Sequence, residues 1–294
     1  MTTDSVALAR LRRQIDEIDD QIHDLMMRRA QIVLEVGAAK GTGPTVRPGR
    51  EAEILRRLVK RNRLLPTTAL VRIWREIIVA MSSLQGPVSV AVYLPGNDPG
   101  FWDLARDYYG ATVPLARHRT PGAVLRAVTE HPGLLGILPL PREGEAEPWW
   151  RHLATDEGES LPRIIARLPF LAGRGRDAVV VARLPTDASG EDRSFVVLEL
   201  AEDVSRTNLL SLIKHAGLAA RFVTSAPALG EGSDKLHLFD MAGVVAAADS
   251  RLANLVADNQ AQIRRAIPIG CYAVPIEEKP RLRAAQAEAA PAGS

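Results

Sequence analysis

The sequence predicts a multidomain protein in which an all-α, three-helix region is followed by an α/β segment and an α+β, ferredoxin-like region. Apolar residues recur every three or four positions up to about residue 86, which is a helical period. From residue 87 short β-rich runs alternate with helical segments, and the last folded stretch has the order β-α-β-β-α-β. These changes divide the chain into residues 1–86, 87–190, 191–277 and 278–294, and we expect the last to be disordered because it has nothing to bury.

The first helix is expected to span about residues 5–40. Its apolar row consists of Leu8, Leu11, Ile15, Ile18, Ile22, Leu25, Ile32 and Val36. At about 1.5 Å per residue this helix is a rod of roughly 50 Å, too long to bury the row on a compact monomer. The prolines of GTGPTVRPG end it, and helices at about residues 50–63 and 67–85 follow, the second with threonine caps after Pro66. One very long helix among three suggests that two chains intertwine as a homodimer.

The α/β segment is expected to contain strands in VSVAVYL and LLGILPL and helices in DPGFWDLARDYYG and TPGAVLRAVTEH. It ends near residue 185, where PTDASGEDR is predicted to be a linker. The α+β region is expected to open with the strand SFVVLEL and the helix SRTNLLSLIKHAG. The strands AARFVTSAP and KLHLFDMAG, the helix DSRLANLVADNQAQIRRA and the strand CYAVPI complete it, in the order of a ferredoxin-like plait.

Composition narrows the classes of protein that the chain can belong to. The formal net charge of +2 does not indicate nucleic acid or an anionic membrane as partner. The basic run RRLVKRNR has no aromatic residues between its cations and is more simply the solvated face of a helix than a nucleic-acid surface. The single Cys271 excludes an internal disulfide framework, and His118, His131 and His152 lack a metal-like spacing. No apolar run approaches the roughly 18 residues of a membrane span. We expect a cytoplasmic protein without metal or cofactor.

An arginine interrupts the apolar row of the first helix. Arg29 lies in LMMRRAQIVLEVGAAK, and Lys40 follows eleven residues later, within about 20° on the same helix face. The two residues are about 16 Å apart along the axis, so their long side chains can converge on a small molecule between them. A buried cation is costly unless a carboxylate binds it, so the pattern predicts an anionic partner at this face.

That partner could be a protein side chain or a ligand. The available glutamates are Glu35, Glu51, Glu53 and Glu76. The second helix begins with Arg50 and Glu51, and a glutamate at this position simply complements the helix dipole. Arg50 is not explained in that way. This second cation favours a ligand, although an ion pair within the protein stays open.

Three segments now carry a family resemblance. LARLRRQIDEIDDQIHDLMMRRAQIVLEVGAAK, VRPGREAEILRRL and VRIWREIIVAMSSLQ resemble the three helices of the all-helical chorismate mutases, over about residues 5–86. The combination of L-x-x-x-R-x-x-I-D-x-I-D, R-x-x-x-x-x-x-V-G-x-x-K, R-E and a terminal Q carries the resemblance. It implies an isomerase that rearranges chorismate to prephenate without metal, nucleophile or proton transfer. Such an enzyme holds the dianionic substrate folded and stabilises charge on the breaking ether oxygen.

Carried over residue by residue, the resemblance assigns roles to the cations and neutral donors. Arg29 would bind one substrate carboxylate, and Arg12, donated by the partner chain across the dimer interface, would bind the other. Lys40 and Gln85 would donate hydrogen bonds to the ether oxygen. The interlocked dimer of this family also accounts for the length of the first helix.

The second and third helices supply the remaining members and two departures from the family pattern. Arg50 would orient the carboxylate or neighbouring groups, and Glu51 would accept a hydrogen bond from the substrate hydroxyl. Met81 replaces a serine that is common in the family, and the loop carrying Pro48 and Gly49 is one residue shorter than usual. These departures support an alternative, a non-catalytic regulator that binds chorismate, prephenate or another shikimate-pathway enzyme.

The rest of the chain resembles a prephenate dehydratase domain followed by a regulatory ACT domain. REGEAEPWW follows LPLP without the Asn-Ser pair of the dehydratases, and the Thr-Arg-Phe motif is absent near DAVVVARLP, so we predict no dehydratase activity. The ACT-like region has VTSAP in place of Glu-Ser-Arg-Pro, which favours a packing or dimerisation module over a phenylalanine sensor. Trp149 and Trp150 are more simply core anchors or interdomain packing residues than a ligand-stacking pair.

Overall fold

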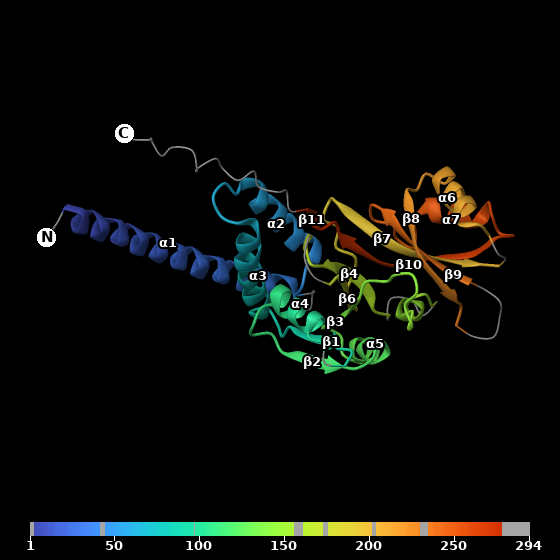
Figure 1. Cartoon of the computed structure of the whole chain (residues 1–294), viewed down its shortest axis with the longest axis horizontal. Coiled ribbons are helices and arrows are strands. Elements are labelled where there is room, and N and C mark those ends of the chain that lie inside the picture. The colour runs from blue at the N-terminus through green and yellow to red at the C-terminus, as the bar shows by residue number, and fades with distance from the viewer. Residues whose placement is uncertain are drawn as a thin grey trace, which may run out of the picture.

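The computed structural model describes residues 3–41, 45–96, 98–155, 161–172, 176–201, 204–229 and 235–277. The predicted tail at residues 278–294 and part of the first Gly/Pro bend lie outside these ranges. A long N-terminal helix lies at one end of the molecule, a sheet covered by helices occupies the middle, and two further helices lie at the other end (Figure 1).

Three helices form the N-terminal region, as the sequence predicts. They are α1 (Thr3–Lys40), α2 (Pro48–Arg61) and α3 (Thr67–Ser83). Helix α1 projects from the body as a rod, with only its C-terminal part near α3 (Figure 1). Helix α2 begins at Pro48, where the missing amide hydrogen costs nothing. The predicted threonine cap of α3 does not form, because Pro66 occupies the N-cap position and no side chain caps the helix.

The α/β segment contains the two strands and two helices expected, together with further strands. Its first half consists of β1 (Ser89–Tyr93), α4 (Gly100–Tyr109), β2 (Leu115–His118), α5 (Pro121–Glu130) and β3 (Leu134–Pro139). Strand β1 pairs in parallel with both β2 and β3. The short 3₁₀ helix Trp149–Leu153 follows, then β4 (Arg163–Leu168), β5 (Leu171–Ala172) and β6 (Ala178–Ala182). Sequence reasoning missed β2 because, as an edge strand of four residues, it is only partly buried.

The C-terminal region has the predicted β-α-β-β-α-β order. Its elements are β7 (Asp192–Leu200), α6 (Arg206–His215), β8 (Ala220–Pro227), β9 (Lys235–Ala242), α7 (Ser250–Ala257) and β10 (Ile263–Ala273). The predicted last helix is too long, because IRRAIP belongs to β10. The short β11 (Ile276–Glu277) pairs with β5 in a separate two-stranded sheet.

Within the described ranges, one mixed sheet of nine strands crosses the predicted boundary at residue 190, in the order β2-β1-β3-β6-β4-β10-β7-β9-β8. The join is the pairing of Gly270 in β10 with Ile164 in β4. Gly270 has a φ of 148°, and a Cβ there would lie 2.2 Å from the Ile164 carbonyl oxygen. Glycine therefore permits the backbone approach that fuses the two strand sets.

Both faces of this sheet are covered. Helices α2, α3 and α4 share one apolar cluster with β1, β3, β4 and β6, so α2 and α3 have a common core with the α/β segment. The opposite face packs against α5 and the buried Trp149 and Trp150, which confirms their prediction as core anchors. A third cluster lies beneath α6 and α7. Among the described residues no helix is long and apolar enough to cross a membrane.

Candidate functional site

Arg29 lies in the C-terminal half of α1 and is half-buried. Its Nη1 atom is fully buried and has no hydrogen-bond partner among the described residues, and burial lowers the pKa of the guanidinium. Two candidate glutamate partners are engaged elsewhere, since Glu51 pairs with Arg75 and Glu53 with Arg50. A buried donor without an acceptor is costly, so this atom is suited to an incoming anion.

The end of α3 meets α1 one turn beyond Arg29. The side-chain amide of Gln85 donates to the Val33 carbonyl oxygen at 2.9 Å. A Cβ on Gly37 would lie 3.2 Å from Gln85 Cγ, so the chain allows little beyond glycine there. The structure thus brings Gln85 against α1 at Val33 and Gly37, one to two turns beyond Arg29.

The other two predicted site residues of α1, Arg12 and Lys40, lie on either side of Arg29 along the helix and are exposed. Lys40 is the last residue of the helix. Arg12 is 17 positions before Arg29, a separation of about 25 Å along the axis. Arg12 therefore cannot share a small-molecule site with Arg29 of the same chain.

Arg50 and Glu51 lie in the first turn of α2 and point to different surroundings. The exposed guanidinium of Arg50 pairs with Glu53 at 2.7 Å, and its backbone amide donates to Asp187. Glu51 is only 6% exposed, and its Oε2 accepts from Arg75 Nη1 at 2.5 Å. The carboxylate that sequence reasoning assigned to a substrate hydroxyl is thus engaged in an ion pair between α2 and α3.

Arg75 is a buried cation that sequence reasoning did not single out. It is 2% exposed, its Nε donates to the Tyr108 carbonyl oxygen at 2.9 Å, and its guanidinium carbon lies 3.5 Å from the centre of the Tyr108 ring. The sequence feature that could have identified it is the same as for Arg29, a cation within an apolar row. Arg75 lies in the row of α3 that contains Val71 and Ile78. Met81, in the same helix, is buried.

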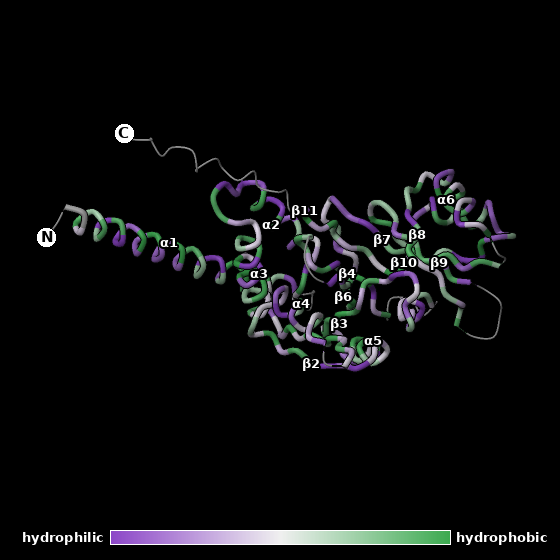
Figure 2. Tube along the Cα trace, in the orientation of Figure 1, coloured by the Kyte–Doolittle hydropathy of each residue, from purple (hydrophilic) through white to green (hydrophobic). Residues whose placement is uncertain are grey.

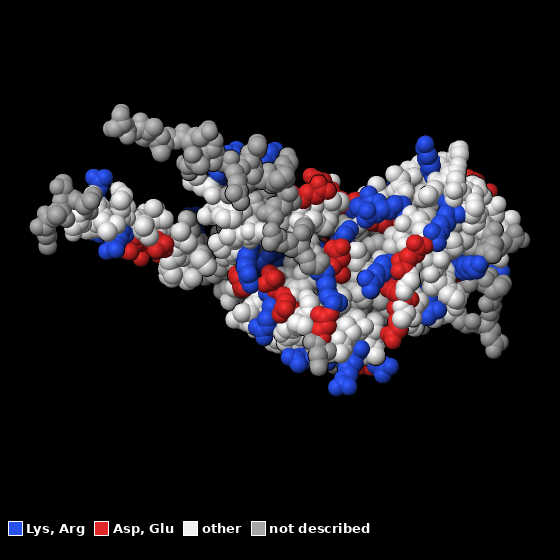
Figure 3. Space-filling view, in the orientation of Figure 1, with Lys and Arg blue, Asp and Glu red and all other residues white. Residues whose placement is uncertain are grey.

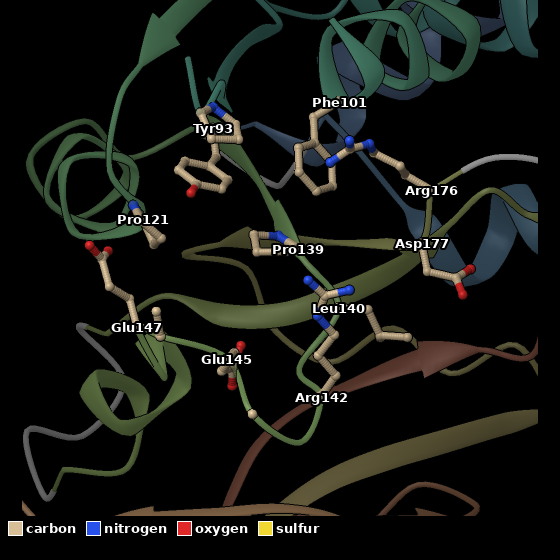
Figure 4. Close-up of a pocket in the computed structure, with 13 residues that line it drawn as sticks. Tyr93, Phe101, Pro121, Pro139, Leu140, Arg142, Glu145, Glu147, Arg176 and Asp177 are labelled. Atoms are coloured by element: carbon tan, nitrogen blue, oxygen red, sulfur yellow. The ribbon is translucent and has the colours of Figure 1, made fainter. Parts of the chain in front are cut away.

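A second candidate site is a cavity of about 930 Å³ at the carboxyl ends of β1 and β3, where open α/β sheets usually bind ligands (Figure 4). Tyr93 and Phe101 lie on one side of it and Arg142 and Glu145 on the other. Burial raises the pKa of Glu145 to about 7, although Trp150 Nε1 donates to its carboxylate at 2.7 Å. Sequence reasoning missed this acid because it belongs to no motif.

Charges elsewhere do not single out another site. Basic and acidic side chains are interspersed over the face drawn in Figure 3. In the part of the chain that the structure describes, no three or more His, Cys, Asp or Glu side chains are grouped to hold a metal ion.

Comparison with known proteins identifies a family match for the helical region. Residues 11–86 match the family model of chorismate mutase type II. The chain is 34% identical over 128 residues to a bifunctional chorismate mutase/prephenate dehydratase of Aquifex aeolicus (strain VF5), which covers 41% of this chain and 34% of that protein. It is 36% identical over 85 residues to a protein of the same description from Neisseria gonorrhoeae (strain ATCC 700825 / FA 1090). That match covers 29% of this chain and 24% of that protein. The chain thus spans about a third or less of the length of these curated relatives.

Solved structures match over a longer part of the chain but at low identity. A prephenate dehydratase from Streptococcus mutans matches 65% of this chain and 100% of its own length, with a TM-score of 0.47 and 14% identity. A prephenate dehydratase from Staphylococcus aureus subsp. aureus Mu50 matches 63% and 100%, with a TM-score of 0.48 and 7% identity.

Proposed function

We propose that this chain, whose residues 11–86 form a chorismate mutase type II domain, catalyses the rearrangement of chorismate to prephenate. The observation that carries the proposal is the buried Nη1 of Arg29, which has no partner among the described residues and lies one turn before Val33, the acceptor of Gln85. A guanidinium binds a carboxylate through short charge-assisted hydrogen bonds, and chorismate has two carboxylates.

The reaction requires the site to position the substrate and stabilise charge. Arg29 would hold one carboxylate in the folded reactive conformer, and the partner's Arg12 would hold the other. Lys40 and Gln85 would donate to the ether oxygen, where negative charge develops. For this Gln85 exchanges its present acceptor, the Val33 carbonyl, for the substrate oxygen.

Arg50 and Glu51 complete the proposed set from α2. Arg50 is exposed and would orient the carboxylate after leaving Glu53. Glu51 would accept from the substrate hydroxyl through Oε1, because Oε2 accepts from Arg75.

A homodimer is part of the same proposal. Eleven large apolar residues of α1, from Val6 to Val36, are 40% to 64% exposed over a helix of 38 residues, and apolar positions recur along the rod in Figure 2. An exposed apolar surface of this length marks an interface. A second copy would cover it and bring its Arg12 to the neighbouring Arg29.

Sedimentation tests the dimer. Ile18→Asp puts a charge in the apolar row and is expected to give a monomer without mutase activity. His23→Asp puts the same charge on the far side of the helix, where His23 is exposed, and should stay dimeric. A dimeric, active Ile18→Asp protein would contradict the interface.

The activity is tested by following the ultraviolet absorbance of chorismate. Wild type should consume chorismate at micromolar enzyme, Arg29→Ala should lose at least about 100-fold in kcat/KM, as expected for a buried charge contact, and the exposed neighbour Arg28→Ala should keep full activity. Wild type without turnover would contradict the mutase. Full activity of Arg29→Ala would contradict the site.

The alternative function is a non-catalytic regulator that binds chorismate or prephenate. The buried ion pair of Glu51 and the apolar Met81 favour it, because each removes a polar contact from the mutase site. Chorismate binding by calorimetry without turnover is the result expected for this alternative.

We further propose that the chain does not dehydrate prephenate, because the Asn-Ser and Thr-Arg-Phe motifs of that reaction are missing. Dehydration would need a general acid, and Glu145 in the cavity, with a pKa near neutrality, is a candidate for it. This observation favours dehydratase activity and so defines the test of the proposal. Phenylpyruvate formed from prephenate by wild type would contradict the proposal, and its loss in Glu145→Gln would identify Glu145 as the acid.

A further inference from the structure

The first turn of α2 is capped by a residue from a distant part of the chain. Helix α2 has no side-chain cap from its own N-cap residue, Arg47. Instead Asp187 Oδ2 accepts from the Arg50 amide at 3.1 Å, and Oδ1 accepts from Arg47 Nη2 at 2.6 Å and Nε at 3.0 Å. A carboxylate in this place satisfies a free amide and complements the helix dipole.

The contact is close and partly shielded from solvent. The Asp187 side chain is 14% exposed. Partial burial alone would raise its pKa, but hydrogen bonds from Arg47 and from the amides of Arg50 and Gly49 outweigh this effect and hold the pKa below its usual range. A Cβ on Gly49 would lie 2.2 Å from the Asp187 carbonyl oxygen, so only glycine allows α2 to approach the loop. The carboxylate is therefore ionised and held at neutral pH.

A second anchor lies two turns farther along α2. Arg56 Nη1 donates to the Ser189 carbonyl oxygen and hydroxyl at 3.2 and 2.9 Å. Its Nη2 donates to the carbonyl oxygens of Glu191 and Val274, at 2.8 and 2.9 Å, beside the start of β7 and the end of β10. The segment predicted as a linker is thus bound along α2, and α2 is attached to the C-terminal sheet.

We propose that Asp187 is a positioning residue of the mutase site, through which the C-terminal half of the chain holds Arg50 and Glu51 in place. This inference rests on the proposed mutase function. Asp187 does not touch substrate in this role. It acts on the α2 turn that carries both site residues, so movement of the loop at residues 185–191 changes the affinity of the site for chorismate.

The experiment uses the full chain and two readouts. Asp187→Ala should raise hydrogen exchange at the Arg50 amide about tenfold and the KM for chorismate about tenfold, with kcat within about twofold. Tenfold corresponds to about 1.4 kcal/mol, which is within the cost of losing a helix cap. Asp187→Asn should stay within about threefold of wild type in both, because asparagine caps a helix nearly as well.

The matched control is Asp249→Ala. Asp249 caps α7 by accepting from the Arg251 amide, and its side chain is 12% exposed, so the change removes an equivalent cap far from α2. It should leave KM and exchange at Arg50 at wild-type values. If Asp187→Ala does not fold, Arg47→Ala, which removes the cation from the same contact, should raise KM about threefold.

The outcomes separate this inference from the proposed function. Wild type without turnover contradicts the mutase and the positioning role together. Wild type with turnover, combined with an Asp187→Ala protein whose exchange or KM is unchanged, overturns the positioning role alone. An equal rise of KM in Asp249→Ala also overturns it, because the effect is then one of general stability.

Discussion

Replacing Arg75 by methionine should be among the most destabilising single changes in the helical region. Methionine has a similar length and retains packing against Tyr108, but it leaves the carboxylate of Glu51 buried without its cation. Breaking a buried ion pair from one side costs about 3–5 kcal/mol, and the lost bond to the Tyr108 carbonyl oxygen adds about 1 kcal/mol. We therefore expect a loss of about 4–6 kcal/mol in the free energy of unfolding.

The double variant Glu51→Leu/Arg75→Met separates the charge from the packing. Because both charges then leave the core together, it should be more stable than Arg75→Met alone by about 2 kcal/mol or more. Urea unfolding followed by tryptophan fluorescence measures both, and Trp74 lies beside the site. A cost below about 1 kcal/mol for Arg75→Met, or a double variant as unstable as the sum of the singles, would refute the reasoning.

Three further changes test other parts of the structure. Gly49→Ala should cost about 1–3 kcal/mol in urea unfolding because its Cβ would meet the Asp187 carbonyl, whereas Gly122→Ala, whose Cβ meets nothing within 4 Å, should not destabilise. Because the pKa of Glu145 is raised from 4.5 to about 7, the native state holds its proton longer than the unfolded state. Wild type should therefore lose stability between about pH 4.5 and 7, by on the order of 1–2 kcal/mol relative to Glu145→Gln in urea titrations at each pH; a parallel pH profile for the two would contradict this. Burial raises the pKa of the Cys271 thiol to about 11, so a disulfide reagent at pH 8 should label it only after unfolding.

Several features of the fold could be predicted from local sequence. The three-four spacing predicts α1 to α3, and the changes of period predict β1, β3 and the β-α-β-β-α-β order. Each signal is a property of one short segment, because apolar spacing reports which face of an element is buried. Trp149 and Trp150 were predicted to be core or interdomain packing residues because large aromatic side chains usually pack in this way, and both are buried.

The candidate site was predictable only in part. Arg29 could be identified because a cation in an apolar row needs an anionic partner, and the identity of that partner was left open between glutamate and ligand. The structure shows its Nη1 without a protein partner among the described residues, while Glu51 is engaged by Arg75. Sequence reasoning singled out only Arg29, although Arg75 also lies in an apolar row, and it could not show which arginine a glutamate reaches.

The sequence by itself determined the helical period of the first 86 residues, the cation on the face of α1 and the element order of the C-terminal region. Only the tertiary structure decided that Gly270 joins the strands into one sheet, that Asp187 caps a helix 137 residues earlier, and that Glu145 has a pKa near neutrality. The physical reason is range. Periodicity acts over a few residues, whereas strand pairing, capping from a distance and desolvation depend on groups that meet only when the chain folds.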